Sequence, residues 1–526
     1  MSAKVVVAET IADAGIASLR EQFEVDVAIG LDPHDLADRL ADADALIVRS
    51  ATNVDRTLIE SAPRLKVIGR AGIGVDNIDL AAATERGVLV VNAPHANTIS
   101  AAEHAMALLL SQARNIPRAH GTLTSGVWDR KSFEGIELHG KAMGIIGLGK
   151  IGTLVAQRCL AFGMRVLAYD PFVGPDRARQ LGVELMELDD LLPQADFISI
   201  HLPKTKDTEN LIGGDNLLKV KPGVRIINTS RGGIVNEADL AAAIEDGRVG
   251  GAGLDVFETE PITESPLFSL PQVVVTPHLG ASTTEAQDKA GIDVATAVAS
   301  ALRGELVLSA VNVDLGRDVA DEVKRYLPVA EQLGRAFVGL ARGLGDQIVV
   351  RAEGRIAQFG LRPLKLAVLK GLMEAVSSEP VSYVNAPSLA EERGIAVDLE
   401  STEQAVEYVS EVKISGEVGG RLVSLSGSLG RKGPMMVEIM GNDVELVFSE
   451  KMLIVRNEDI PGVIGRMASY LGDEGVNIAN MVVGRSRVTG EASLMGLNID
   501  HPLSESQVDS IRHLPGIEEA TYLELG

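Results

Sequence analysis

The stretch MGIIGLGKIGTLVAQRCLAFG, residues 143–163, joins an apolar run to a glycine-rich turn and then to a helical pattern. In such a strand–turn–helix unit Gly147 permits the tight turn, Gly149 lets the backbone approach a pyrophosphate, and Gly152 lets the helix pack closely on the sheet. The amino terminus of the helix adds an anion site. The stretch therefore predicts a dinucleotide-binding α/β fold.

Asp170 ends the next apolar run, RVLAYD, where a carboxylate can accept hydrogen bonds from the hydroxyl groups of an adenine-side ribose. Pro171, Phe172 and Val173 follow it, so no cation stands beside it to hold a 2′-phosphate. The sequence therefore favours NAD over NADP.

Alternating β-rich runs and helical patterns extend from this stretch in both directions. From Lys141 to Pro277 the β-rich runs are MGIIG, RVLAYD, FISIHL, RIINTS, GAGLDV and VVVTPH. In the first part of the chain we expect strands at residues 4–8, 25–28, 45–49, 65–70 and 88–92. Because strands that alternate with helices form parallel sheets, we expect two doubly wound domains.

Two long helices are expected to connect these domains. One is predicted to begin at Ser100, where Ser100 and Glu103 fit a capping box, and to end before Pro117. The other is predicted over residues 284–302. Because each would cross from one domain to the other, they predict a hinged pair of domains with a cleft between them.

The remainder of the chain has a different pattern. Residues 317–450 combine helical patterns with several short strands near 410–449 and contain no catalytic motif. From Lys451 the order is βαββαβ, which is typical of a ferredoxin-like ligand-binding module.

Composition limits the class of protein. A chain of 526 residues accommodates about three or four domains, and a net charge of −24 argues against a nucleic-acid partner. The single cysteine, Cys159, excludes a disulfide framework, and no apolar run approaches the ~20 residues of a membrane span. The start MSAKVVVAET enters a strand without a leader pattern. We expect a cytoplasmic protein with no membrane partner and no metal centre.

Three residues behind the glycine loop form a candidate catalytic set. Arg231 in NTSRGG, Glu260 in DVFETEP and His278 in TPHLGAST follow apolar runs, and the carboxyl ends of parallel strands meet at one edge of a sheet. A carboxylate beside a histidine lets the ring exchange a proton with a substrate oxygen near neutral pH. A guanidinium can clamp a carboxylate and polarise the adjacent carbonyl. The set predicts hydride transfer on a 2-hydroxy or 2-oxo acid.

The motifs GLGKIG, NTSRGG, GLDVFETEP and TPHLGAST have the order and spacing of the D-2-hydroxyacid dehydrogenase family, and the whole chain resembles the long-form phosphoglycerate dehydrogenases within it. The resemblance implies oxidation of 3-phosphoglycerate with NAD in serine biosynthesis, with Arg231, Glu260 and His278 as catalytic residues. It also implies four domains, which are a substrate-binding domain (1–98 and 283–316), an NAD-binding domain (99–282), an intervening domain of the allosteric substrate-binding type (317–450) and an ACT regulatory domain (451–526).

The resemblance also implies further ligand contacts. Contacts to NAD are expected from Gly147, Gly149, Lys150, Ile151, Gly152, Asp170, Leu202, Thr229, Ser230, Arg231, Asp255, His278 and Gly280. Contacts to the substrate are expected from Arg49, Ser50, Arg70, Ile73, Gly74, Val75 and Arg130. The loop RAGIGVDNID, residues 70–79, offers backbone N–H groups to the substrate carboxylate, and the three arginines suit a dianionic phosphate.

In the ACT domain the resemblance implies that L-serine, as a feedback inhibitor, contacts Asn457, Asp459 and Asn477. Residue 457 is an asparagine where a ring side chain is frequent in related domains. The alternative is an ACT fold that serves only as an oligomer interface. The edge of this domain and the intervening domain both indicate a homo-oligomer, and we expect a homotetramer.

Two other functions stay open at this point. One is another D-2-hydroxyacid dehydrogenase, acting on glyoxylate, lactate or 2-hydroxyglutarate, and reduction of 2-oxoglutarate is also a conceivable side activity. The other is a non-catalytic protein that senses the dinucleotide, as transcriptional corepressors of the family do. The intact catalytic set and the net charge of −24 argue against this last function.

Overall fold

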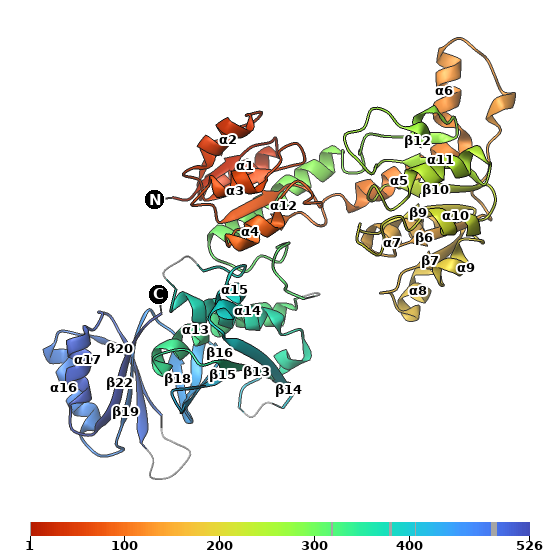
Figure 1. The fold of residues 1–526 in the computed structure, drawn as a ribbon. Helices are drawn as coiled ribbons and strands as arrows, with labels where there is room; N and C mark the ends of the chain where they lie inside the picture. The colour runs from red at the N-terminus through yellow and green to blue at the C-terminus, as the bar shows by residue number, and fades with distance from the viewer. Residues whose placement is uncertain (1, 317–318, 378–380, 405–406, 485–491, 526) are drawn as a thin grey trace.

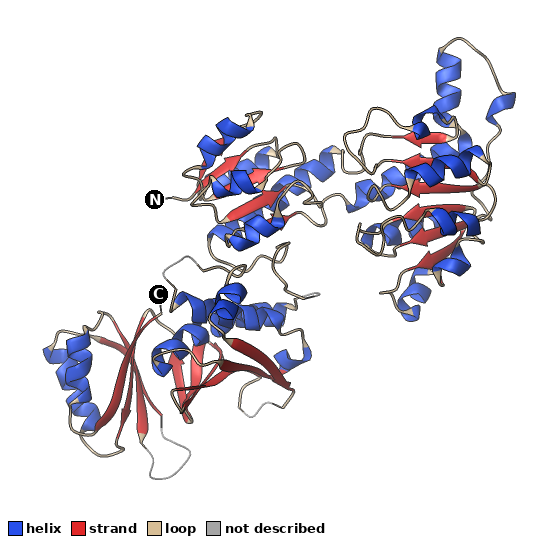
Figure 2. Ribbon diagram, in the orientation of Figure 1, coloured by secondary structure: helices blue, strands red, loops and turns tan. Residues whose placement is uncertain are grey.

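The structure is a computed structural model that describes residues 2–316, 319–377, 381–404, 407–484 and 492–525. In these residues the strands form sheets of five, seven, six and four strands, each with helices packed against it (Figures 1 and 2). The predicted fold class is confirmed, because the first two sheets are parallel, the third is mixed and the fourth is antiparallel. The predicted domain boundaries stay a prediction.

The five-stranded sheet has the order β2-β1-β3-β4-β5 and is parallel throughout. Its strands are β1 Lys4–Val7, β2 Glu24–Val27, β3 Ala45–Val48, β4 Val67–Arg70 and β5 Leu89–Asn92, close to the predicted ranges. Helices α1 (Asp13–Arg20) and α12 (Thr284–Leu302) cover one face, and α2 (Pro33–Leu40), α3 (Arg56–Glu60) and α4 (Leu80–Glu85) cover the other. Since both faces are covered, a central strand such as β3 is apolar and buried along its whole length.

The seven-stranded sheet has the order β12-β11-β10-β9-β6-β7-β8. Its strands are β6 Ala142–Ile146, β7 Arg165–Tyr169, β8 Glu184–Leu185, β9 Phe197–Ile200, β10 Val224–Asn228, β11 Val249–Leu254 and β12 Val273–Val275. Helices α5 (Thr98–Arg114), α7 (Lys150–Ala161) and α8 (Pro175–Leu181) pack on one face, and α9 (Leu188–Leu191), α10 (Gly214–Lys219) and α11 (Glu237–Glu245) pack on the other. Cys159 is buried in the first of these layers, where burial raises the pKa of its thiol to about 12.

The capping box predicted at Ser100 is wrong. Helix α5 begins at Thr98 after Asn97, so Ser100 lies inside the first turn, and its Oγ is 2.8 Å from the Oγ1 of Thr283. At Asn115 the backbone turns left-handed (φ 54°), and a further helix, α6 (Ile116–Thr124), begins with Pro117 in its first turn, a position that accepts proline. Helix α12 begins at Thr284, as predicted.

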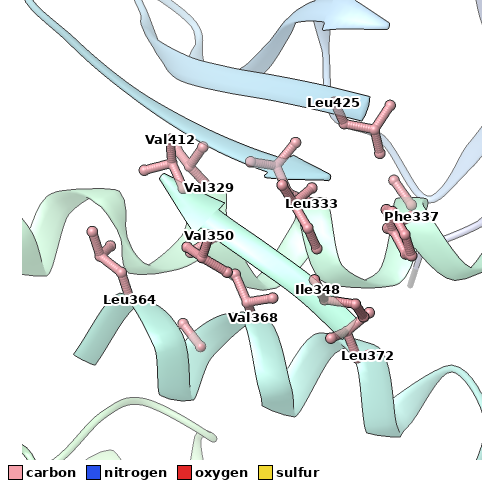
Figure 3. Packing of buried hydrophobic residues seen from close by; sticks show 14 of the residues in the cluster. Val329, Leu333, Phe337, Ile348, Val350, Leu364, Val368, Leu372, Val412 and Leu425 are labelled. Atoms are coloured by element: carbon pink, nitrogen blue, oxygen red, sulfur yellow. The ribbon is translucent and has the colours of Figure 1, made fainter. Parts of the chain in front are cut away.

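The six-stranded sheet has the order β14-β13-β15-β16-β17-β18, and helices α13 (Asp321–Ala341), α14 (Arg362–Glu374) and α15 (Ala386–Glu392) accompany it. Its strands are β13 Gln347–Gly354, β14 Ala396–Thr402, β15 Ser410–Val418, β16 Arg421–Gly430, β17 Gly433–Ile439 and β18 Asn442–Val447. The expectation of strands only near 410–449 missed β13 and β14. Figure 3 shows the core of this region, where Leu333 and Phe337 of α13 and Val368 of α14 meet Ile348 and Val350 of β13.

The four-stranded sheet has the order β20-β21-β19-β22. Its elements follow the predicted βαββαβ sequence, with β19 Lys451–Asn457, α16 Val463–Asp473, β20 Ile478–Gly484, β21 Ser493–Ile499, α17 Glu505–Arg512 and β22 Ile517–Glu524. The helices cover one face, and buried residues of the other, among them Met452 and Leu523, continue the core of the six-stranded sheet. Among the helices in the described ranges, none is long and apolar enough to cross a membrane.

Candidate active site

The strand register brings the predicted catalytic and cofactor residues to one edge of the seven-stranded sheet. Ile146 pairs with Ile200, Ile200 with Asn228, and Asn228 with Leu254, so these strands end at the same level. Gly147, Thr229 and Asp255 each follow directly after one of these strand ends. In the five-stranded sheet Val48 pairs with Arg70 in the same way, which places Arg49 beside Arg70. In each of the two parallel sheets, the predicted site residues therefore lie at the carboxyl ends of the strands.

His278 and Glu260 form a hydrogen-bonded pair. The Nδ1 of His278 is 2.6 Å from the Oε2 of Glu260, and the Oε1 of Glu260 accepts a hydrogen bond from the backbone N–H of Phe257 at 2.9 Å. The hydrogen bond with Glu260 raises the pKa of His278 against the opposing effect of burial. Burial alone would raise the pKa of Glu260, but hydrogen bonds from His278 and Phe257 outweigh it and lower that pKa. Nδ1 is thereby fixed, and Nε2 is the ring nitrogen left to exchange a proton.

Asp255 holds the backbone of the loop that carries His278. Its carboxylate has no exposed surface and accepts hydrogen bonds from the N–H groups of Leu279 at 2.7 Å and Gly280 at 2.8 Å. The Oγ1 of Thr276 donates to it at 2.6 Å, and the Nε2 of His104 lies 3.1 Å from it. These hydrogen bonds outweigh the effect of burial and lower the pKa of Asp255. The contact between Asp255 and NAD stays a prediction.

Arg231 reaches from the seven-stranded sheet to the loop of the five-stranded sheet. A Cβ at Gly74 would lie 2.8 Å from its Nη2, and its Nε is 3.9 Å from the Oδ2 of Asp76. The loop Ile73–Val75 lies beside this guanidinium and is itself held by Asn92, whose Nδ2 donates to the carbonyl of Ile73 at 2.6 Å. The structure therefore brings Arg231 and the predicted carboxylate loop together.

Arg49 and Arg70 lie near Arg231, and the three arginines form a positive cluster. Burial, and then the like charge of Arg231, lowers the pKa of Arg70, and Arg49 acts in the same direction. The Nε of Arg70 is buried and has no hydrogen-bond partner among the residues that the structure describes. Ser50 is exposed next to Arg49. The carboxylates of Asp76 and Glu9 oppose these effects on Arg70. A group of three arginines on neighbouring segments still favours an anionic ligand.

The structure does not bring Arg130 to this cluster within one chain. Arg130 is exposed at the start of the short helix Lys131–Phe133, in the segment that follows α6. Figure 1 shows α6 and this segment at the edge of the seven-stranded sheet that lies away from the other sheets. The role of Arg130 in binding phosphate stays a prediction.

The residues of the glycine loop fit a dinucleotide. Gly147 has φ 95°, and a Cβ there would meet the carbonyl of His201 at 2.5 Å and the side chain of Leu202 at 2.9 Å. A Cβ at Gly152 would lie 2.0 Å from the carbonyl of Gly147, whereas at Gly149 no atom would lie within 4 Å. Open space before the first turn of α7, where Lys150 and Ile151 lie, is what a pyrophosphate needs.

Two further groups suit the rest of NAD. The Oδ2 of Asp170 accepts from the N–H of Leu148 at 2.8 Å, which fixes the carboxylate beside the glycine loop. The Oγ1 of Thr229 is buried and meets no hydrogen-bond partner in the described part of the chain, and the carbonyl of Thr229 lies near Gly280. Ser230 is turned inward, since its N–H and its Oγ both donate to Asn228 at 3.1 Å.

The three residues predicted to bind serine do not meet within one chain. Asn457, at the end of β19, pairs with Ser493 at one end of β21, whereas Ile478, next to Asn477, pairs with Ile499 at the other end. A strand of this length spans roughly 20 Å. Asp459 is exposed in the loop after Asn457. The Oδ1 of Asn457 is buried and has no hydrogen-bond partner within the described ranges, whereas Asn477 donates to Asp500 at 2.7 Å.

Sequence reasoning missed two histidines near the site. His104, on α5, contacts Asp255 and Thr276, and its spacing from Ser100 on one helix face was the available signal. His201 follows β9 beside the glycine loop, where burial lowers its pKa to about 4 and its Nε2 is 2.8 Å from the Oγ of Ser199. His201 is therefore neutral and supports the turn.

Comparison with known proteins finds three family matches along the chain. Residues 106–280 match the NAD-binding domain of D-isomer-specific 2-hydroxyacid dehydrogenases, residues 322–440 match the D-3-phosphoglycerate dehydrogenase intervening domain, and residues 451–511 match the ACT domain.

Two proteins that are similar over nearly their whole length are both described as D-3-phosphoglycerate dehydrogenases. The D-3-phosphoglycerate dehydrogenase of Mycobacterium leprae is 48% identical over 90% of both chains, and that of Methanocaldococcus jannaschii is 41% identical over 99% of this chain and 100% of its own. A crystal structure of a Thermus thermophilus protein matches with a TM-score of 0.54 and 34% identity and covers 59% of this chain and 99% of its own.

Proposed function

Because the chain belongs to the D-3-phosphoglycerate dehydrogenases, NAD-dependent oxidoreductases, we propose that it oxidises 3-phospho-D-glycerate at C2 to 3-phosphooxypyruvate, the first step of serine biosynthesis. The observation that carries the proposal is the position of Arg231. It comes from the seven-stranded sheet and lies near Arg70 and the loop 73–75 of the five-stranded sheet. An anion with a carboxylate at one end and a phosphate at the other matches this arrangement.

In the proposed mechanism the substrate is held at both ends. Arg231 and the backbone N–H groups of residues 73–75 bind the carboxylate, and Arg49 and Arg70 bind the phosphate. The buried and unpartnered Nε of Arg70 supports this assignment, because a phosphate oxygen would supply the hydrogen bond that it lacks. The C2 hydroxyl is thereby directed to His278.

His278 then acts as the general base through Nε2. As the C2–H bond breaks, the hydroxyl proton passes to Nε2 and the C2–O bond becomes a carbonyl. The glycine loop and Asp170 would hold NAD⁺, which when bound would accept the hydride that leaves C2. Glu260 stabilises the imidazolium that forms, and general base assistance of this kind contributes roughly 100- to 10,000-fold to the rate.

The proposal is tested by NADH formation from 3-phosphoglycerate and NAD⁺ at alkaline pH, with D-lactate and D-2-hydroxyglutarate as competing substrates. We expect turnover of 3-phosphoglycerate that His278→Ala abolishes while NAD binding persists. Arg49→Met should lower kcat/KM for 3-phosphoglycerate more than for D-lactate, and Arg86→Met, an exposed arginine of the same region, should change neither. A wild-type preference for D-lactate would contradict the proposed substrate.

We also propose that L-serine inhibits the enzyme and binds between copies of the chain. Asn457 and Asn477 lie at opposite ends of β21, so one serine can contact both only if a second copy supplies one of them. Helix α6 has no buried residue and exposes Ile116 and Leu123, which supports an assembly that covers them. We expect a homotetramer, and light scattering measures the mass directly.

The regulatory proposal is tested by adding millimolar L-serine to the assay. Suppressed turnover that Asn477→Ala relieves would support a shared serine site, and turnover that serine does not affect would leave the ACT domain as an interface. The same preparation tests the proposed side reduction of 2-oxoglutarate, for which we expect NADH consumption that His278→Ala abolishes.

A further inference from the structure

Helix α5 holds both ends of the loop that carries His278. Ser100 and His104 stand one turn apart on α5, so their side chains lie on the same face. The Nε2 of His104 is 2.9 Å from the Oγ1 of Thr276, at the start of the loop, and the Oγ of Ser100 is 2.8 Å from the Oγ1 of Thr283, at its end. Neither side chain is among the residues assigned above to the substrate or NAD.

A buried carboxylate connects the first of these contacts to the middle of the loop. His104 and Thr276 both contact the carboxylate of Asp255, and this carboxylate also accepts hydrogen bonds from the N–H groups of Leu279 and Gly280, directly after His278. Since Thr276 donates its hydroxyl to Asp255, the Nε2 of His104 is the donor to both residues. A change at His104 therefore reaches the backbone on both sides of His278.

His278 needs this support because of its backbone conformation. It has φ 54°, in the left-handed region that few residues other than glycine adopt without cost. Such a conformation persists only where the surrounding structure fixes it. The N–H of His278 donates to the carbonyl of Asp255 at 2.9 Å, so the same residue that binds His104 also fixes the strained position.

We propose that Ser100 and His104 are positioning residues for His278, and that their hydrogen bonds to Thr283, Thr276 and Asp255 hold the imidazole in line with Glu260 and the substrate hydroxyl. They act through the loop. The inference rests on the proposed function, which makes His278 the general base.

The test compares His104→Leu, which removes the donor and keeps the bulk, with His104→Gln, whose amide N–H can still reach Asp255. Because a misplacement on the order of 1 Å can cost about 100-fold, we expect His104→Leu to lower kcat roughly 10- to 100-fold. The KM for 3-phosphoglycerate should not change, because its carboxylate and phosphate are bound elsewhere. His104→Gln should restore most of kcat, and Ser100→Ala, at the other end of the loop, should lower kcat alone.

The matched control is His34→Leu, which removes an exposed imidazole from α2 and should leave kcat and KM unchanged. Wild-type kcat in His104→Leu would overturn the inference, and so would equal losses in His104→Gln and His104→Leu. If His104→Leu fails to fold, Ser100→Ala decides, since an unchanged kcat in that variant would refute the positioning role of these hydrogen bonds. A wild-type enzyme that does not oxidise 3-phosphoglycerate would overturn the proposed function and, with it, this inference.

Discussion

Alanine at Gly152 and alanine at Gly149 are expected to damage the enzyme in different ways, although both lie in the glycine loop. At Gly152 a Cβ would lie 2.0 Å from the carbonyl of Gly147 and 3.3 Å from Ile145, and the backbone atom cannot swing aside. At Gly149 φ is −71°, which any residue adopts, and a Cβ would have no neighbour within 4 Å. Gly152→Ala therefore strains the protein itself, whereas Gly149→Ala fills space that we assign to the pyrophosphate.

The expected magnitudes follow from these contacts. Gly152 lies in α7, where alanine gains about 1 kcal/mol over glycine in helix propensity. A collision with backbone belongs at the upper end of overpacking costs, about 3 kcal/mol. The net loss of about 2 kcal/mol should lower the unfolding midpoint of a domain of this size by roughly 4–8 °C. Gly149→Ala should cost only about 0.5–1 kcal/mol, because alanine is a weaker N-cap than glycine.

Calorimetry with and without NAD distinguishes the two effects. NAD at a hundred times its Kd stabilises the wild-type domain by about 2.7 kcal/mol. If a methyl at residue 149 weakens binding by about 100-fold, only about 0.4 kcal/mol of that stabilisation remains in Gly149→Ala. A full wild-type shift with NAD in Gly149→Ala would refute the placement of the pyrophosphate. An unchanged midpoint in Gly152→Ala would refute the reasoning from the backbone contact.

Three further predictions concern ionic contacts. Oxidation needs neutral His278 and should increase as pH rises through its raised pKa; Glu260→Gln should shift this limb of the kcat/KM profile to lower pH and reduce kcat roughly tenfold, whereas an unshifted limb would contradict the pairing. Lys370→Met should destabilise the intervening region by roughly 3 kcal/mol in urea unfolding, because the buried ammonium lies 2.7 Å from Glu331 and 3.1 Å from Glu374. An unchanged free energy of unfolding would show that Arg335, which also pairs with both carboxylates, is sufficient to neutralise them. Arg421→Ala removes a bidentate contact to Glu519 between the third and fourth sheets and should cost about 1 kcal/mol, and a loss that is equal in low and high salt would argue against an ionic origin.

The parallel sheets were predictable because strands covered on both faces leave apolar runs that the chain must bury. The same reasoning missed β13 and β14, because the alternating burial of Gln347–Gly354 and the mostly exposed Ala396–Thr402 carry no continuous apolar signal. The capping box at Ser100 failed for another reason. Ser100 and Glu103 have the spacing of a capping box, but the hydroxyl of Ser100 forms its hydrogen bond with Thr283, which is distant in the chain.

The candidate site was predictable where residues follow strand ends directly. Arg231, Glu260 and His278 follow β10, β11 and β12, and the parallel register of these three strands places the segments that carry them at one end of the sheet. Contacts that depend on a helix packing across the sheet were not predictable, as with His104. The separation of Asn457 from Asn477 was also hidden, because motif spacing does not tell which end of a strand each residue occupies.

The return of α12 to the five-stranded sheet has a consequence for synthesis on the ribosome. The sheet is complete in sequence at Asn92, but Val294 and Val298, which pack over Gly69, belong to a helix that begins only at Thr284. At translation rates of about 5–20 residues per second, the part of the first sheet that α12 covers stays exposed for roughly 10–40 s after Asn92 is made. The nascent chain must therefore protect an apolar surface while the entire NAD-binding sheet is made.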